Sequence, residues 1–264
     1  MTVERKRADE TSAQLAENEV LSAKLNEAVD ALGAQADELR RLNSRLVEFT
    51  ADAAHELRAP LAIMRTVADR ALDRPRRANE YRESLTTLQR EVVRLTELAE
   101  ALLMLARADE GQLALQADAV DVADFLADIA ARWQSLIETR DLTLELDLPD
   151  QGRVHADQLL LTRLFDNLMD NACRYAPSGG AICLSANSDP WGWHLSVSNT
   201  GSGIAPELHD EIFERFKRGD PSRTRETGGA GLGLALCQTI ARLHGGAVRL
   251  EQPSHVTKFT VDLP

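Results

Sequence analysis

The feature that most limits how this chain can fold is the scarcity of helix breakers in its first 110 residues. Before Gly111 the only glycine is Gly33, and Ala, Glu, Leu and Arg dominate the stretch. Apolar residues recur there at steps of three and four, the heptad spacing of a coiled coil. They are Leu21, Leu25, Ala28, Leu32, Leu39, Leu42, Leu46, Phe49 and Ala53. The sequence therefore predicts one long helix whose stripe needs a partner, and we expect a parallel dimer.

A solitary amphipathic helix packed on its own domain is the alternative, although about four heptads without a stop signal is long for a globular helix. A break follows at Asp73-Arg74-Pro75, because a proline pushes the preceding residue out of the helical region. A second helix is predicted from about Glu80 to Ala108, and Gly111 is placed to end it. Its apolar stripe is Leu85, Leu88, Val92, Leu95, Leu98, Leu102 and Leu105. Two such hairpins together would form a four-helix bundle.

From about residue 112 the pattern changes to alternating helices and strands. Helical stretches are predicted at about 122–138, 156–174 and 231–243, and polar–apolar alternation predicts strands at 143–146, 194–197 and 258–261. We expect an α/β sandwich, a sheet covered by helices on one face. The fold class is thus α+β, with a coiled-coil helix (1–45), a helical hairpin (46–111) and a sandwich domain (112–264).

Composition argues against several classes of function. The formal net charge of −12 and the 4% aromatic content argue against a nucleic-acid surface, so no nucleic-acid partner is expected. No apolar run approaches the roughly 20 residues of a membrane span. Three widely spaced cysteines suggest neither a disulfide framework nor a zinc site, and a reducing cytosolic setting fits.

The first motif that carries chemistry is the stretch from Asp52 to Leu61. His55 stands off the apolar seam, so its imidazole would face solvent and could act as a nucleophile. Glu56 beside it could take the ring proton, and Pro60 kinks the helix one turn later. A surface His-Glu pair on a charged helix face is the plain alternative.

This stretch resembles the phospho-acceptor box of the sensor histidine kinases of two-component systems, whose core is His-Glu-Leu-Arg-x-Pro-Leu. His55, Glu56, Arg58 and Pro60 stand in their places. The second helix resembles the dimerisation hairpin of that family, with Glu91, Arg94-Leu95 and the run from Leu102 to Arg107. The resemblance then depends on whether the ATP-binding boxes follow in order.

The segment from Asn167 to Tyr175 resembles the asparagine box of the family. Asn167, Asn171 and Arg174 are four and three residues apart, so they share one helix face. An amide oxygen of Asn171 could ligate Mg²⁺, Arg174 could neutralise phosphate charge, and Tyr175 could pack near adenine. The alternative is a polar face on a helix that ends before Pro177.

The run from Asn199 to Ile204 resembles the first glycine box, Asp-x-Gly-x-Gly. Gly201 and Gly203 allow a turn with positive φ and a close approach of adenine. The chain departs from the family here, because Asn199 stands where the family has the aspartate that accepts the adenine amino hydrogen. An amide carbonyl can accept that bond as well.

Two further boxes complete the series. The segment from Glu211 to Arg218 resembles the phenylalanine box, in which Phe213 and Phe216 would anchor a lid; Arg218, Arg223 and Arg225 supply positive charge. The segment from Gly228 to Ala235 resembles the second glycine box, where backbone N–H groups at a helix start meet phosphate. Its expected binding residues are Gly229, Gly231, Leu232, Gly233 and Leu234.

The resemblance implies an ATP- and Mg²⁺-dependent protein-histidine kinase. It would phosphorylate itself on His55, with Glu56 as base, and pass the phosphoryl group to an aspartate of a receiver domain in a separate response regulator. Related ATP hydrolases of the gyrase kind carry a water-activating Glu where this chain has Asn167, and an amide cannot take a proton from water. Ala59 lacks the hydrogen-bonding side chain of relatives that dephosphorylate their regulator, so weak phosphatase activity is expected.

The same resemblance bears on context. Residues 1–45 are similar to a signalling helix that follows an upstream sensor or membrane segment, and none is present in this chain. We therefore expect a cytoplasmic protein, tethered to a membrane if the chain is a portion of a longer kinase. The alternative function, favoured by Asn199, is a nucleotide-binding pseudokinase or scaffold that dimerises and docks a partner.

Overall fold

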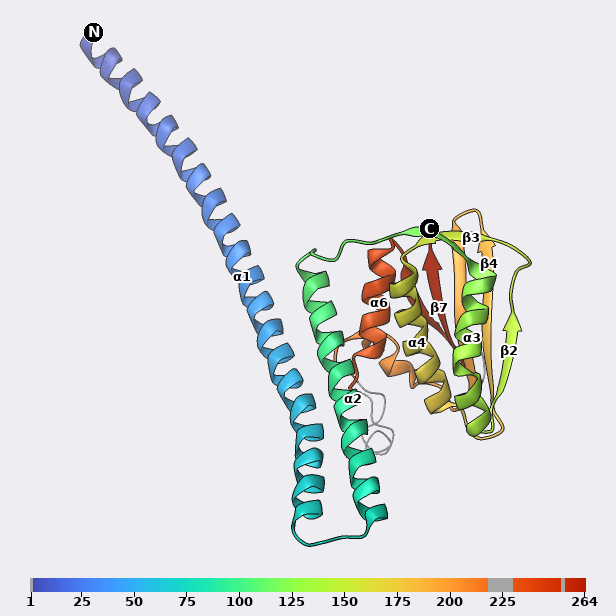
Figure 1. The fold of residues 1–264 in the computed structure, drawn as a ribbon. Coiled ribbons are helices and arrows are strands. Elements are labelled where there is room, and N and C mark those ends of the chain that lie inside the picture. The colour runs from blue at the N-terminus through green and yellow to red at the C-terminus, as the bar shows by residue number, and fades with distance from the viewer. Residues whose placement is uncertain (1, 218–229, 253–254) are drawn as a thin grey trace. The chain divides into compact units, whose positions relative to one another are not determined.

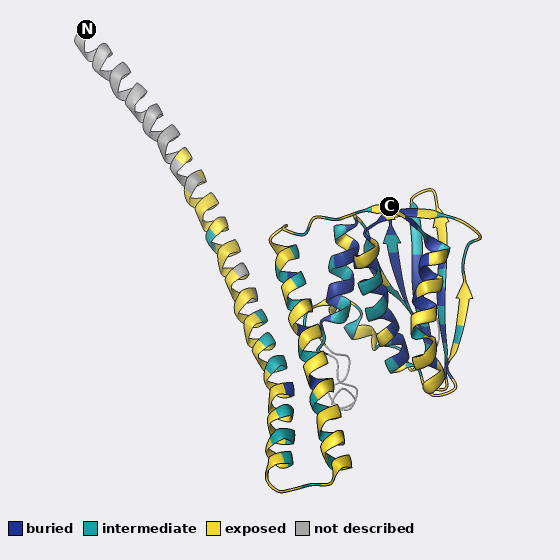
Figure 2. Cartoon of the chain, viewed as in Figure 1, coloured by how far each residue is buried: buried dark blue, intermediate teal, exposed yellow. Residues whose placement is uncertain are grey.

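The computed structural model describes residues 2–217, 230–252 and 255–264, and it divides into two compact units, Met1–His55 and Glu56–Pro264. Figure 1 shows the order of the elements. Helix α1 (Thr2–Leu72) runs through the first unit and into the second. Within the first unit Leu32, Leu39 and Leu46 of the predicted seam are exposed (Figure 2). An apolar stripe open to solvent is what the coiled-coil prediction requires, and it leaves room for a partner helix.

A helical hairpin begins the second unit. Helix α1 ends at Leu72, the chain turns through residues 73–77, and α2 spans Ala78–Asp109. The Arg77 N–H donates to Glu80 Oε2 at 2.9 Å, and this bond is the main reason that the pKa of Glu80 is lowered. Gly111 takes φ +65° just beyond the end of α2. The predicted break and the predicted stop are therefore both found.

In the described part of the chain, two sheets and three α-helices follow the hairpin. Strands β1 (Asp118–Asp121) and β3 (Arg153–Ala156) form an antiparallel pair. The larger sheet has the order β2-β4-β5-β7-β6. Its strands are β2 (Thr143–Asp147), β4 (Ala181–Asp189), β5 (Gly192–Thr200), β6 (Ala247–Glu251) and β7 (Val256–Leu263). Among these described strands, β2 and β4 pair in parallel and the other neighbours are antiparallel.

One face of the larger sheet is covered by helices (Figure 1). They are α3 (Val122–Thr139), α4 (Gln158–Tyr175) and α6 (Gly233–Leu243). On β4 the side chains of Ile182, Leu184 and Ala186 are buried, because alternate residues of a strand point to the same face. This is the predicted one-sided sandwich. Three-residue 3₁₀ turns, η1 (Pro206–Leu208) and η2 (Glu211–Phe213), follow β5.

The last third of α2 belongs to the same core. Leu98, Ala101 and Leu105 are buried with the residues of the sandwich. Two ion pairs accompany this packing, Arg163 with Glu100 at 3.5 Å and Arg215 with Asp109 at 2.7 Å. The end of the hairpin is thus part of the hydrophobic core that supports α4 and α6.

A buried histidine fixes the end of α6 to the start of α4. His244 Nδ1 donates to the Ile240 carbonyl at 2.8 Å, so its Nε2 is the acceptor for the Asp157 N–H at 3.0 Å. Asp157 in turn accepts from the Leu160 N–H and caps α4. These bonds set the relative position of the two helices that carry most of the predicted site.

The opposite face of the sheet is polar and carries a charged cluster around His194. Its Nδ1 lies 2.7 Å from Asp262 Oδ1, and its Nε2 lies 3.2 Å from Asp189 Oδ2. Hydrogen bonds to Asp262 and then Asp189 raise the pKa of the imidazole above its usual 6.5. A bond from Arg249, followed by the one from His194, lowers the pKa of Asp262.

The cluster predicts how stability depends on pH. The pKa of His194 is higher in the folded state than its unfolded value of 6.5. Its contribution to the free energy of unfolding is therefore complete below pH 6.5 and is lost as the pH rises through the folded-state pKa. We expect the Tm of the wild type to exceed that of His194→Asn by more at about pH 6 than at about pH 9. The exposed His155 on β3 provides the control, His155→Asn. An equal Tm difference at both pH values would contradict the prediction.

Candidate active site

Helix α4 carries the polar face that the sequence predicts. The Asn167 side-chain Nδ2 donates to the Arg163 carbonyl at 2.7 Å. A Cβ added at Gly233 would stand 2.9 Å from Asn167 Oδ1, so the first residue of α6 lies against this amide. Asn167 of the asparagine box and Gly233 of the second glycine box are therefore neighbours, although 66 positions separate them.

Near the end of α4 the charges are already partly paired. Arg174 Nη2 lies 2.6 Å from Asp170 Oδ2. The guanidinium therefore already has a carboxylate partner, in addition to any phosphate that it would bind. Asp170 also affects α2: the pKa of Glu97 is raised, first by burial and then by the charges of Asp170 and Glu100. Asn171 is half-buried and Tyr175 is exposed.

The loop after β5 has the shape that its glycines permit. Asn199 is buried, and its Nδ2 donates to the Thr200 carbonyl at 3.0 Å. The carbonyl Oδ1 is the acceptor of this amide, the kind of atom that could accept a hydrogen bond from a base. Gly203 takes φ +75°, which favours glycine, and Ile204 behind it is half-buried.

Two side chains that the sequence reasoning missed hold this loop. The Ile204 N–H donates to Gln252 Oε1 at 2.9 Å, and the Ile204 carbonyl accepts from His209 Nε2 at 3.1 Å. No spacing rule could have found the first contact, because 48 residues separate its partners. Only the sheet register, which brings the β6–β7 connection beside the end of β5, creates it.

The phenylalanine box packs on the sheet and on the start of α6. Phe213 meets Phe259 edge to face, with ring centroids 6.2 Å apart. The Phe216 N–H donates to the Gly231 carbonyl at 2.8 Å. Leu232 is buried and Leu234 half-buried, so these two fix α6 in place. Arg218 and Gly229, like Arg223, Arg225 and Gly228, lie outside the described residues.

His55 is exposed on α1 and is the last residue of the first compact unit. Glu56 is half-buried and Arg58 exposed in the second unit. The exposed imidazole fits the predicted role of a nucleophile that a separate domain can approach.

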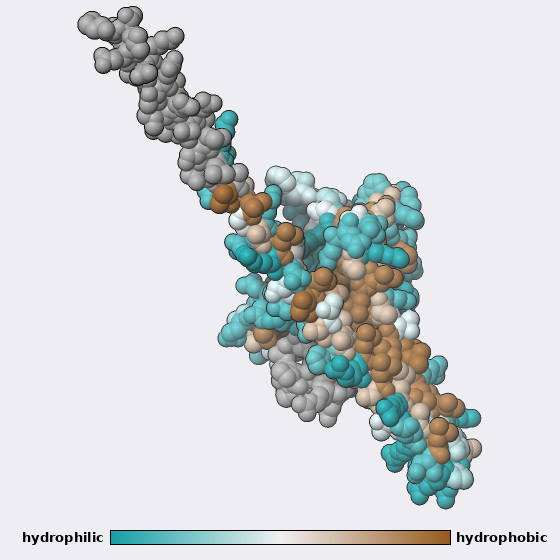
Figure 3. Space-filling view, turned by 90° about the vertical axis from the view of Figure 1, so that its left-hand side faces the viewer, coloured by the Kyte–Doolittle hydropathy of each residue, from teal (hydrophilic) through white to brown (hydrophobic). Residues whose placement is uncertain are grey.

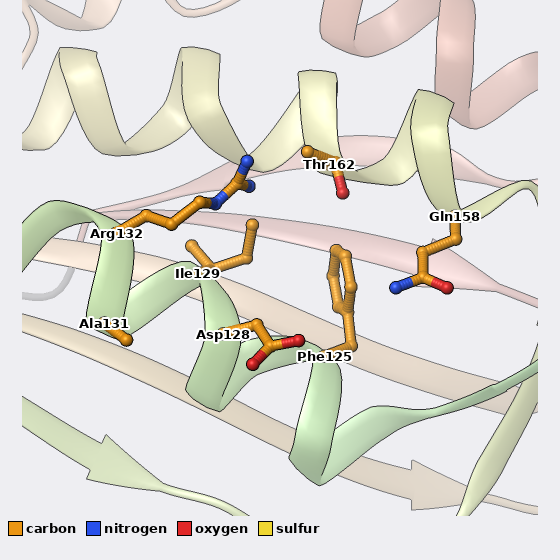
Figure 4. Close-up of a pocket in the computed structure, with 7 residues that line it drawn as sticks. All are labelled: Phe125, Asp128, Ile129, Ala131, Arg132, Gln158 and Thr162. Carbon is orange, nitrogen blue, oxygen red and sulfur yellow. The ribbon is translucent and has the colours of Figure 1, made fainter.

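Two hollows in the sandwich differ in what lines them. One, of about 450 Å³, lies between α3 and α4 and contains none of the motif residues (Figure 4). The other, of about 600 Å³, borders the first glycine loop. It is lined by Tyr175, Pro177, Thr200, Gly201, Ser202, His255 and Val256. We assign the candidate site to the second hollow because Tyr175 and Gly201 come from two of the predicted boxes.

The chemistry of these residues suits an anionic nucleotide with a cation. Helix α6 begins at Gly233, where unpaired backbone N–H groups and the helix dipole favour phosphate. Amide oxygens on α4 suit a hard divalent cation. Among the described residues there is no group of three His, Cys, Asp or Glu side chains that could hold a metal by themselves.

Comparison with known proteins agrees with this geometry. Residues 45–111 match the His Kinase A (phospho-acceptor) domain, and residues 156–264 match the histidine kinase-, DNA gyrase B- and HSP90-like ATPase. The signal transduction histidine-protein kinase BaeS of Escherichia coli (strain K12) is 35% identical over 243 residues, which cover 89% of this chain and 52% of BaeS. The sensor-like histidine kinase SenX3 of Mycobacterium tuberculosis (strain ATCC 25618 / H37Rv) is 32% identical over 225 residues, 85% of this chain and 55% of SenX3. The chain spans about half the length of these curated relatives.

Solved structures share the fold. The Acinetobacter baumannii histidine kinase AdeS has a TM-score of 0.65 at 24% identity, covering 79% of this chain and 96% of that one. The histidine kinase ThkA, solved in complex with the response regulator protein TrrA, has a TM-score of 0.64 at 23% identity, covering 85% of this chain and 64% of that one. Within the described part of the chain, no helix is long and apolar enough to cross a membrane.

Proposed function

Because the chain belongs to the sensor histidine kinases of bacterial two-component systems, we propose that it transfers the γ-phosphoryl group of ATP to His55. The observation that carries the proposal is the contact between Asn167 and Gly233, which brings two separate ATP boxes to one place. An amide at Asn167 cannot take a proton from water, so hydrolysis is disfavoured and an exposed imidazole is the better acceptor.

Each of the proposed site residues has a role in this reaction. ATP supplies the phosphoryl group; the amide oxygen of Asn171 would help to hold Mg²⁺, which would supply positive charge to the phosphates. Arg174 and the N–H groups at the start of α6 orient the phosphates, while Asn199 and Tyr175 hold the base. The His55 imidazole forms the N–P bond, the bond to the leaving ADP breaks, and Glu56 accepts the ring proton.

We propose that the chain works as a homodimer and passes the phosphoryl group to an aspartate of a separate response regulator. Hydrophobic side chains gather along the hairpin of α1 and α2 on the face that Figure 3 shows. Leu61, Leu85, Val92 and Leu103 of the hairpin are exposed, and a second hairpin would cover them in a four-helix bundle. The complex of ThkA with TrrA supports a regulator as the partner.

The test is incubation of the protein with γ-labelled ATP and Mg²⁺. We expect label that is lost in acid, as a phosphoramidate would be, and that moves to a receiver domain when one is added. Acid-stable label would overturn the assignment to histidine. Nucleotide binding without any label would favour the alternative, a pseudokinase that only dimerises and docks a partner.

Ala59 predicts weak dephosphorylation of the regulator. It lies four residues after His55, is exposed, and has no group that could orient a water. We expect Ala59→Thr to accelerate loss of phosphate from a phosphorylated regulator by about tenfold or more. Ala59→Val, a β-branched control without a hydroxyl, should have no effect. Equal rates for Ala59→Thr and the wild type would remove the basis of this prediction.

A further inference from the structure

The connection between β6 and β7 touches the first glycine loop at two points. The Gly201 N–H donates to the His255 carbonyl at 2.9 Å, and the Ile204 N–H donates to Gln252 Oε1 at 2.9 Å. The Gln252 amide also occupies the space beside Gly203. A Cβ added there would stand 2.0 Å from Gln252 Nε2 and 2.7 Å from its Cδ. Gly203 therefore provides room for Gln252 in addition to its positive φ.

The peptide groups of Ile204 are held from both sides. Gln252 Oε1 accepts a hydrogen bond from the Ile204 N–H, and His209 Nε2 donates to the Ile204 carbonyl at 3.1 Å. Neither bond belongs to a helix or a strand ladder. Glycine-rich backbone loses much conformational freedom when it is ordered. Side chains that order this backbone before a ligand binds lower the entropic cost of binding, and so strengthen the affinity.

We infer that Gln252 is a positioning residue for the nucleotide, fixing the Gly203–Ile204 backbone at the base end of the site without contacting the reacting atoms. The inference rests on the proposed function, because it needs this loop to hold the base. The loop borders the hollow that contains Tyr175 and Gly201. Gln252 lies in none of the boxes that the sequence suggests.

The test measures the Kd of a fluorescent ATP analogue, and of ATP and ADP by competition, together with Tm. Gln252→Met keeps the length of the side chain and removes the amide acceptor. We expect about three- to tenfold weaker binding, as one lost hydrogen bond predicts. The factor should be the same for ATP and ADP, because both carry the base. Gln252→Glu retains an oxygen acceptor and should restore the Kd to within about twofold.

Gln238 on α6 offers a matched control. Its Oε1 accepts from the Val248 N–H at 3.2 Å, which is the same kind of bond away from the glycine loop. Gln238→Met should lower Tm and leave the Kd unchanged. If Gln252→Met does not fold, Gln252→Ser, which removes the bond and adds no bulk, takes its place.

The outcomes separate the two proposals. Wild-type affinity in Gln252→Met, or an equal loss of affinity in Gln238→Met, would overturn the positioning role and leave the kinase assignment intact. A wild-type protein that binds neither ATP nor ADP would overturn the proposed function and this inference with it. A loss restricted to ATP would also contradict the inference, since it would place the effect at the γ-phosphate.

Discussion

Replacing His55 by glutamine is expected to reduce phosphate incorporation from ATP to background, a loss of at least about a thousandfold. The side chain of glutamine is polar and similar in size, but its amide nitrogen is not a nucleophile. His55 is exposed on α1, so the substitution should leave Tm nearly unchanged. The Kd for ATP should also be unchanged, because the proposed binding residues lie on α4, the glycine loop and α6.

His155→Gln is the matched control for that experiment. His155 is also exposed, and it lies on β3 opposite Ala119, outside every box. This variant should incorporate label as the wild type does. Label that persists in His55→Gln at the wild-type level would show that another residue is the acceptor, even if ATP bound normally. Loss of label in both variants would point to a shared folding defect, which Tm would reveal.

Local signals explain which parts of the fold the sequence predicts. The break at Pro75 and the stop at Gly111 depend on single residues with special backbone preferences, and both are found. The α4 face follows from the helical period alone. Strand β4 was not predicted, although Ile182, Leu184 and Ala186 alternate with small polar residues and could have revealed it. Strands β1 and β3 have four residues each, too few for a clear alternation.

The site was predictable where it consists of motifs and not where it consists of long-range contacts. The motifs predict that Asn167, Gly203 and Gly231 belong to the site, and the structure brings Asn167 against Gly233. The bond between the Ile204 N–H and Gln252 follows from tertiary packing that no single segment encodes. The bond between His209 and Ile204 spans five residues, and Arg174 pairs with Asp170 one turn away on α4, so both of these contacts are local.

Of the two described glycines of the second box, Gly231 should be the more sensitive to substitution. It has φ +70°, and a Cβ there would lie 2.8 Å from the carbonyl carbon of Phe216, 2.9 Å from its Cα and 3.0 Å from the Lys217 carbonyl oxygen. These are backbone atoms, so no side-chain rotation can make room. Gly231→Ala would therefore separate the start of α6 from Phe216 and break their 2.8 Å hydrogen bond.

Gly179→Ala is the control that measures the energetic cost of a positive φ alone, without a steric clash. Gly179 has φ +75° and no heavy atom within 4 Å of the added Cβ. We expect this control to lose about 1–2 kcal/mol of stability and to keep its ATP affinity within about twofold. Gly231→Ala should lose more stability and weaken ATP binding by at least about tenfold, because the phosphate-facing N–H groups move with α6. If both variants bound ATP equally well, the start of α6 could not be the phosphate site.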